Sequence, residues 1–174
     1  MRIIRHPALS GFLFLLLFAA CDLYGKIGGD DTNIEGALPE LLKGEWVFPA
    51  TGIPSERYVI GTETIEYGYG GGESVFDFKG IIRFVSNYST DSGVIIIEYT
   101  EAPSYALYNG NSFFGIYYRN LKNDTVQIAN STNLADGYSA PDTATLDEAI
   151  AKFTRLFMGN YIDWGYVNPQ RRVR

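Results

Sequence analysis

The sequence predicts a mostly-β domain whose antiparallel strands follow one another along the chain as a meander. Between residues 44 and 130, short runs rich in β-branched and aromatic residues alternate with turn signals of Gly, Asn, Asp and Ser. No helical pattern interrupts these runs, so each strand is expected to pair with the next one. One amphipathic helix follows near the C-terminus. Such a meander closes into a β-sandwich or an up-and-down barrel.

The strands are expected where apolar runs begin and end at glycine, proline or polar clusters. Residues 39–43 can form a short helical turn, and Pro49 stops the first strand. The glycines at 70–72 break the chain before the longest run, and residues 89–93 form a hairpin loop. The expected strands are residues 44–48, 57–60, 64–69, 76–88, 94–99, 113–119 and 125–130, with a further short one at 105–108.

The longest run, residues 76–88, has an alternating pattern that predicts two unlike faces. Phe78, Ile82 and Phe84 fall at even spacing, and are expected on one face because successive side chains of a strand point to opposite faces. Arg83 is then expected on the other, more polar face.

The helix is expected to begin after Thr145. Thr145 and Glu148 have the spacing of a capping box, in which the threonine hydroxyl accepts the backbone N–H of the glutamate. Gly159 is expected to end the helix. The apolar face of the helix consists of Leu146, Ala149, Ile150, Phe153 and Phe157.

After the helix, residues 161–167 are expected to form the last strand, closed by Pro169. The basic residues Arg171, Arg172 and Arg174 then follow as a solvated C-terminus, with contact to anionic lipid headgroups as the alternative. No internal repeat of fixed period is seen.

The N-terminus carries a separate pattern that ends at Cys21, the only cysteine of the chain. Arg2 and Arg5 precede an apolar stretch at residues 11–18, which is too short for a membrane-spanning helix of about 20 residues. The segment that ends at Cys21 resembles the lipobox of bacterial lipoproteins, although Leu is usual where Phe18 stands. The resemblance implies cleavage before Cys21 and acylation of that residue. An ordinary signal peptide with an incidental cysteine is the alternative.

The lipobox divides the chain into a signal peptide at residues 1–20, a lipidated cysteine with a flexible tether at 21–37, and a folded domain at 38–174. The up to three acyl chains of a mature lipoprotein would hold the protein at a membrane, since one chain alone binds only marginally. The expected location is the cell envelope, at the periplasmic face of the inner membrane or at the outer membrane.

Composition excludes several classes of function. The chain is acidic, with a net charge of −6, and cleavage before Cys21 removes two basic and no acidic side chains, so no nucleic-acid partner is expected. Cleavage also removes the only histidine, and with it the usual zinc ligand and the common catalytic base. We therefore expect no metal and no cofactor. An enzyme would need a carboxylate pair, and no motif marks one among Glu66, Asp77, Glu98 and Asp163.

The folded part resembles the lipocalins and the wider calycin group. The resemblance rests on the order of the elements and on Gly44-Glu45-Trp46, which opens the first strand directly after the short helical turn. In that family this Gly-x-Trp motif lies at the closed end of a barrel, where Gly permits a tight bend and Trp fills the floor. The resemblance implies an up-and-down barrel of about eight strands with one C-terminal helix and a final strand.

Two features of the family are not found at the matching places. One is its Thr-Asp-Tyr turn motif. The other is the arginine that packs over the Trp from the last barrel strand, because Arg119 comes one strand too early and Arg171 or Arg172 too late. The region from Phe76 onward is also similar to uncharacterised spirochaete lipoproteins, a family with no assigned activity.

Aromatic residues make up 15% of the chain and recur through the β region. They are either structural, since tyrosine is favoured in strands, or the lining of a barrel cavity for a small apolar or amphipathic ligand. The candidate ligand-binding residues are Tyr67, Phe84, Tyr99 and Tyr117, with Arg83 and Arg119 to orient a polar head.

Two other functions stay open. A module that binds a protein or a host surface through its exterior loops is the first alternative, and a carboxylate-based hydrolase is the second. The sequence does not identify a ligand, a protein partner or an oligomeric state.

Overall fold

The computed structural model describes residues 36–70, 76–104, 106, 112–131, 142–154, 162 and 164–174. The chain divides into two units, Met1–Asp31 and Thr32–Arg174, and all described residues belong to the second. Cys21 and the predicted signal peptide lie outside the described residues.

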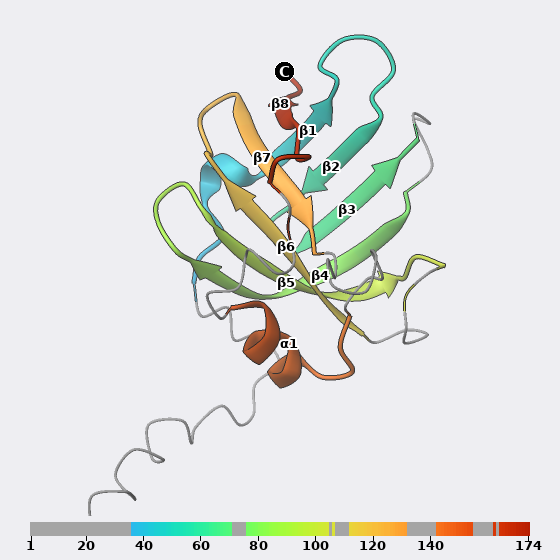
Figure 1. Cartoon of the computed structure of the whole chain (residues 1–174), viewed down its shortest axis with the longest axis vertical. Helices are drawn as coiled ribbons and strands as arrows, with labels where there is room; N and C mark the ends of the chain where they lie inside the picture. The colour runs from blue at the N-terminus through green and yellow to red at the C-terminus, as the bar shows by residue number, and fades with distance from the viewer. Residues whose placement is uncertain are drawn as a thin grey trace, which may run out of the picture. The chain divides into compact units, whose positions relative to one another are not determined.

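Within the described residues, eight strands form a closed antiparallel barrel in chain order (Figure 1). Each strand pairs with the next, and β8 closes the barrel by pairing with both β7 and β1. The predicted fold class, a lipocalin-like up-and-down barrel with a C-terminal helix and a final strand, is therefore confirmed. The strands are β1 (Gly44–Phe48), β2 (Glu56–Ile60), β3 (Thr64–Tyr69), β4 (Phe78–Asn87), β5 (Gly93–Glu101), β6 (Phe113–Arg119), β7 (Thr125–Asn130) and β8 (Pro169–Arg172).

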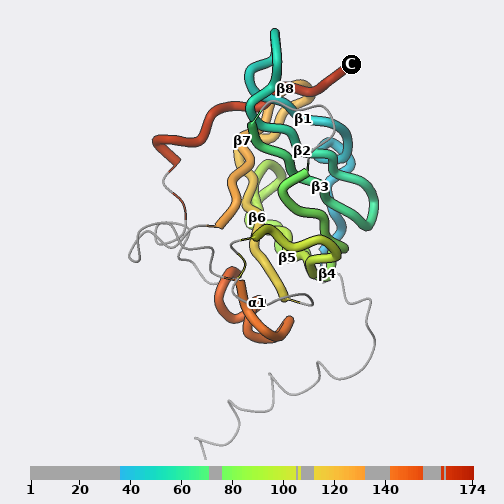
Figure 2. Tube along the Cα trace, turned by 90° about the vertical axis from the view of Figure 1, so that its right-hand side faces the viewer, coloured from blue at the N-terminus to red at the C-terminus, as the bar shows by residue number. Residues whose placement is uncertain are grey.

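In the part of the chain that the structure describes, two short helical elements accompany the barrel. The 3₁₀ turn η1 (Glu40–Leu42) directly precedes β1, as the sequence predicts. Helix α1 (Leu146–Phe153) comes between β7 and β8 and lies outside the barrel wall (Figures 1 and 2). The predicted short strand at 105–108 falls almost wholly outside the described residues.

The alternation of strand direction gives the barrel two distinct ends. The β2–β3, β4–β5 and β6–β7 hairpins share one end with η1, and we call this end the floor. The β1–β2, β3–β4 and β5–β6 connections share the opposite end, which we call the mouth. In Figure 1 the floor is on the left and the mouth is on the right.

Alternate side chains separate into an interior cluster and an outer cluster. On β5, for example, Ile95, Ile97 and Tyr99 belong to the interior cluster, whereas Val94 and Ile96 belong to the cluster that packs against α1. Such a sheet is buried on both faces, which explains why β5 reads as an almost continuous apolar run.

A β-bulge in β4 reverses this alternation partway along the strand. The pairing of β4 with β5 shifts between Ile82 and Phe84, so Ile82 and Val85 are both interior while Phe84 lies in the outer cluster. The prediction that Phe84 shares a face with Phe78 and Ile82 is therefore wrong, because the extra residue changes which face later side chains occupy.

Helix α1 is held on the barrel wall by its last residue. A β-carbon on Gly115 would lie 2.7 Å from Cγ of Phe153, so the ring of Phe153 occupies the space that a side chain on β6 would fill. The hydroxyls of Tyr117 (3.1 Å) and Tyr88 (3.3 Å) both donate to the carbonyl oxygen of Phe153. These bonds satisfy one of the carbonyls that a helix leaves without a partner at its C-terminus.

The start of α1 agrees with the predicted capping box. The Thr145 hydroxyl accepts the backbone N–H of Glu148 at 3.3 Å. The helix ends at Phe153, with Thr154 as its C-cap, instead of continuing to Gly159. Phe157 and Gly159 lie outside the described residues.

The last strand lies further along the chain than predicted. It is Pro169–Arg172, whereas residues 164–167 form a turn in which the backbone N–H of Val167 donates to the carbonyl oxygen of Trp164 (3.4 Å). Pro169 opens the strand instead of closing it, as suits a residue that has no N–H to donate to a ladder. Arg171 and Arg172 are thus part of the barrel wall. Arg171 is exposed, in keeping with the predicted solvated basic tail, whereas Arg172 is half-buried, so the prediction is wrong for Arg172.

Candidate ligand-binding site

The floor of the barrel is sealed by Trp46, whose side chain is fully buried. Its Nε1–H donates to the carbonyl oxygen of Leu42 at 2.7 Å. The guanidinium carbon of Arg172 lies 4.4 Å from the centre of the Trp46 ring, within the range of a cation–π interaction. The arginine that the lipocalin resemblance implies is thus present, and the prediction that Arg172 comes too late in the chain is wrong. It comes late only because α1 lies between the last two barrel strands.

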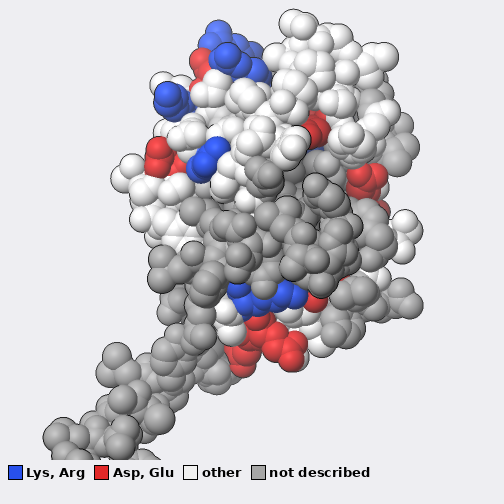
Figure 3. All heavy atoms as spheres, in the orientation of Figure 1, with Lys and Arg blue, Asp and Glu red and all other residues white. Residues whose placement is uncertain are grey.

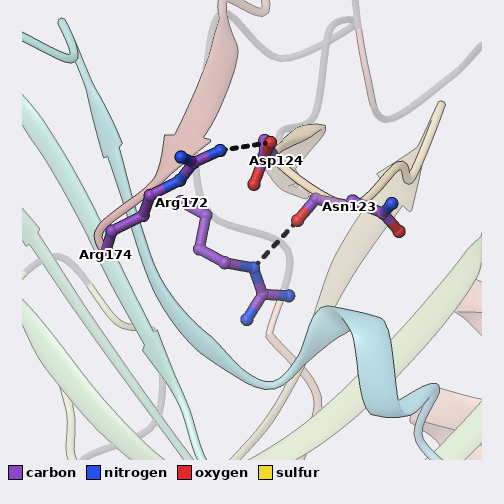
Figure 4. A network of polar contacts seen from close by, with 4 residues as sticks. All are labelled: Asn123, Asp124, Arg172 and Arg174. Atoms are coloured by element: carbon purple, nitrogen blue, oxygen red, sulfur yellow. Dashed lines mark hydrogen bonds and ion pairs between the residues drawn. The ribbon is translucent and has the colours of Figure 1, made fainter.

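Arg172 also ties the floor to η1 and to the β6–β7 hairpin. Its Nη1 donates to the carbonyl oxygen of Lys43 at 2.7 Å, and its Nη2 donates to that of Leu41. Its Nε donates to the carbonyl oxygen of Asn123 at 3.0 Å, a contact that Figure 4 shows. The neighbouring Arg174 pairs with Asp124 at 2.8 Å. Figure 3 shows one group of basic side chains beside the C-terminal end of the chain, with others elsewhere on the same face.

Five aromatic side chains form a ring cluster inside the barrel near its mouth. Each comes from the mouth end of its strand or from within two residues of it. Neighbouring ring centres lie 4.6 Å (Tyr58–Tyr67), 5.1 Å (Tyr67–Phe78) and 5.5 Å (Phe78–Tyr99 and Tyr99–Phe114) apart. These distances are typical of aromatic pairs in direct contact. The ring cluster therefore consists of Tyr58, Tyr67, Phe78, Tyr99 and Phe114.

The ring cluster is packed rather than hollow. None of its five side chains is more than 8% exposed. Side chains around an empty, ligand-sized chamber would keep more accessible surface than this. A ligand at this end would therefore seat against the rings from the mouth side or turn one of them aside.

One carboxylate lies beside the ring cluster, at the first position of β2. Glu56 has the same parity as the interior residues Tyr58 and Ile60, and pairing on both sides of β2 is unbroken, so its side chain faces the barrel interior. Burial raises the pKa of Glu56, and the hydrogen bond that it accepts from Gln170 partly opposes this shift.

Gln170 holds Glu56 in place from the opposite side of β1. Its side chain is fully buried, and its Nε2 donates to Oε2 of Glu56 at 2.9 Å. Its Oε1 accepts the backbone N–H of Ile128 at 2.9 Å, which fixes the orientation of the amide. The pair is therefore the polar part of the candidate site, and the ring cluster is its apolar part.

The structure divides the six predicted ligand-binding residues between the two faces of the barrel wall. Tyr67 and Tyr99 belong to the interior ring cluster. Phe84 and Tyr117 belong to the outer cluster beneath α1. The two arginines, Arg83 and Arg119, also lie away from the ring cluster.

The two arginines have partners on the outside of the barrel. Arg83 forms an ion pair with Glu98 at 2.6 Å. Arg119 donates from Nε to Oε1 of Gln127 at 2.9 Å, and its guanidinium carbon lies 4.2 Å from the ring centre of Trp164. The structure therefore does not bring either arginine together with Tyr67 and Tyr99.

The acidic residues considered for catalysis do not converge. Glu98 is paired with Arg83, and Glu66 lies opposite Lys79 on the neighbouring strand. Burial raises the pKa of Asp77, and a backbone hydrogen bond from Tyr69 opposes the shift. Asp163 lies outside the described residues.

Sequence reasoning missed Glu56 and Gln170. A signal for Glu56 is its even spacing with Tyr58 and Ile60 in a run that begins one residue earlier than predicted. Gln170 lies beyond the predicted last strand, so no local pattern placed it inside the barrel.

Comparison with protein-family models, curated proteins and solved structures finds no match for this chain. Among the described residues, no helix has the length and apolar character to cross a membrane. Nor does that part of the chain contain three or more His, Cys, Asp or Glu side chains grouped so that they could hold a metal ion.

Proposed function

We propose that this protein is a lipid-anchored lipoprotein of the bacterial cell envelope that binds a small apolar or amphipathic molecule at the mouth of its barrel. The observation that carries the proposal is the position of the ring cluster. It lies inside a closed barrel, at the end opposite the floor that Trp46 and Arg172 seal. An eight-stranded barrel is wide enough to hold one small ligand.

The ring cluster has the character of a small-molecule site. Such sites are mostly apolar and aromatic, with a few polar groups that fix the orientation of the ligand. The five rings supply the apolar part, and the Glu56–Gln170 pair supplies the polar groups. Because the rings are packed on one another, only a ligand that is small, or that displaces a ring, can enter.

Native mass spectrometry of the chain purified from its own cells tests this function. We expect a species heavier than the bare chain by the mass of one small molecule. Tyr67→Ala should reduce the fraction of this species, because Tyr67 packs between the rings of Tyr58 and Phe78. Tyr166→Ala is the matched control, since Tyr166 is 82% exposed and outside the cluster. A bare mass, together with no thermal stabilisation by a lipid panel, would contradict the proposal.

The lipid anchor has its own test at Cys21. Cells fed radiolabelled palmitate should label the wild-type chain and not the Cys21→Ser variant. The variant should also be absent from the membrane fraction. A chain without acyl groups loses about 0.8 kcal/mol of membrane-binding free energy for every CH₂ that is no longer buried. An unlabelled wild type, or a variant that stays with the membrane, would exclude the anchor.

Attachment of a protein partner through the exterior is a second candidate function. The β1–β2 loop favours it, since the apolar side chain of Ile53 lies there and is 74% exposed. A photo-crosslinking residue in place of Ile53 should then capture one defined partner in cells. No specific adduct would leave ligand binding as the proposed function.

A further inference from the structure

Glu56 differs from the acidic residues of the outer barrel wall. Glu45 and Glu101 there form ion pairs, with Arg57 at 2.8 Å and with Lys79 at 2.9 Å. Glu56 faces the interior, and no described Lys or Arg side chain forms an ion pair with it. An ionised carboxylate in such a place is disfavoured unless a positive charge joins it.

The surroundings of Glu56 orient its carboxylate without neutralising it. Gln170 donates one hydrogen bond to Oε2, and an amide carries no charge. Gln170 is in turn fixed by the backbone of Ile128, with which it makes contacts at 2.9 and 3.3 Å. The carboxylate therefore has a fixed orientation in which it can accept a hydrogen bond from a ligand that enters at the mouth.

Aromatic faces lie next to this carboxylate on the same side of the wall. In register, Glu56 stands between Phe48 of β1 and Tyr69 of β3, and Tyr58 is the next interior residue of β2. Tyr58 packs on Tyr67 with their ring centres 4.6 Å apart. Aromatic faces attract cations, most strongly where water is excluded.

We propose that the ligand of the barrel is a small organic cation, with an ammonium group that Glu56 binds and an apolar or aromatic body that seats against the ring cluster. This inference rests on the proposed function, since it names the chemical class of the ligand at the same site. The carboxylate selects the positive charge, and the rings of Tyr58 and Tyr67 supply the apolar contact. An anionic amphiphile such as a fatty acid would be repelled by Glu56.

Three probes with one phenylethyl body separate charge from apolar contact: phenethylamine, 2-phenylethanol and 3-phenylpropanoate. Each is titrated calorimetrically into the full chain in a detergent with an uncharged headgroup, with empty micelles as the blank. We expect phenethylamine to bind at least about tenfold more tightly than 2-phenylethanol, as a charge-assisted hydrogen bond warrants. We expect 3-phenylpropanoate to bind most weakly.

The decisive variant is Glu56→Gln, which keeps an oxygen to accept the Gln170 hydrogen bond and removes the charge. It should lose the preference for phenethylamine over 2-phenylethanol and keep its fold. Glu101→Gln is the matched control, because Glu101 ends β5 at the same end of the barrel but pairs outside with Lys79. That control should keep the preference.

The outcomes distinguish the two proposals. If none of the three probes binds, the proposed binding function fails. If the alcohol or the carboxylate binds as well as the amine, or if Glu56→Gln keeps the preference for the amine, the barrel still binds a ligand and the cationic class is wrong. An amine preference that is lost in Glu56→Gln and kept in Glu101→Gln supports the inference.

Discussion

Gly44 lies at the floor of the barrel, where there is no room for a side chain. Its φ angle is 134°, and a β-carbon there would lie 2.7 Å from Nη1 of Arg172. Gly44→Ala therefore adds backbone strain and displaces the guanidinium from Trp46. We expect a loss of about 2–4 kcal/mol in the free energy of unfolding, measured by urea denaturation.

Gly52 provides the control for this prediction. Its φ angle is also positive, 84°, but a β-carbon there would meet no atom within 4 Å. Gly52→Ala should thus lower the free energy of unfolding by about 1 kcal/mol, through backbone strain alone. Equal losses in the two variants would mean that the close approach of Arg172 contributes nothing.

Glu56 predicts a pH dependence of stability. Burial raises its pKa in the folded state above the ordinary 4.5 of a glutamate, so the folded protein binds the proton more tightly than the unfolded chain. Stability should therefore fall as the pH rises from 4.5 through the folded-state pKa. Glu56→Gln removes this effect, so we expect it to melt above the wild type at pH 7.

Thermal melts of both chains between pH 3 and pH 8 check the sign. The advantage of the Glu56→Gln variant should shrink as the pH falls towards 4.5 and vanish below it, where both states of the wild type are protonated. A variant that is less stable than the wild type at neutral pH would show that the ionised carboxylate is compensated in the fold.

The residues of the site were predictable only where local pattern decides them. Gly44 and Trp46 follow from a short motif, and both lie where that motif implies. The position of Phe84 was not predictable. It depends on a β-bulge that reverses the two faces of β4, and no local pattern in the sequence indicates that bulge. Arg172 reaches Trp46 through a pairing of the first and last strands, and a contact over that sequence distance leaves no periodic signal.

Helix α1 is an element whose attachment depends on a missing side chain. Because the ring of Phe153 sits over Gly115, Gly115→Ala should force the helix away from the wall and cost about 1–3 kcal/mol. Hydrogen exchange should then accelerate in the amides of α1 while the barrel strands stay protected.

Gly93 gives the matched control for the helix. A β-carbon there would lie 2.5 Å from the carbonyl oxygen of Ser86 and 2.7 Å from the hydroxyl of Tyr118, at the floor. Gly93→Ala should therefore loosen the β4–β5 hairpin and leave the exchange of α1 nearly unchanged. Faster exchange of α1 in both variants would show that the helix has no separate anchor at Gly115.

Among the elements, strands with strong local alternation or propensity were predictable almost to the residue. The bounds of β1, β3, β6 and β7 agree with the predicted ranges. The last strand was not predictable in this way. Residues 161–167 are rich in the apolar and aromatic side chains typical of strands, whereas β8 has the sequence Pro-Gln-Arg-Arg. Two neighbouring strands, β7 and β1, select β8 by pairing, and this outweighs the propensity of its own residues.

At the scale of the whole molecule, the barrel closes because its last strand, β8, pairs with its first strand, β1. The meander predicts neighbouring pairs but leaves sandwich and barrel open, and the choice depends on whether the last strand returns to the first. Here Trp46 pairs with Arg172 and Val47 with Arg171. Because closure removes both free edges of the sheet, the structure leaves no exposed strand edge between β1 and β8.

Truncation at the C-terminus tests how far the barrel depends on this closure. Removal of residues 169–174 takes away β8, the contact of Arg172 with Trp46 and the interior Gln170. We expect the shortened chain to lack a cooperative unfolding transition and to show exchange in β1 and β7, the two strands that lose their partner. Removal of Arg174 alone breaks only an ion pair in which the arginine side chain is 81% exposed, and should cost about 0–1 kcal/mol. If a chain that ends before Pro169 still unfolds in one sharp transition, the other seven strands are sufficient for cooperative folding. The role of β8 would then be limited to closing the floor of the barrel.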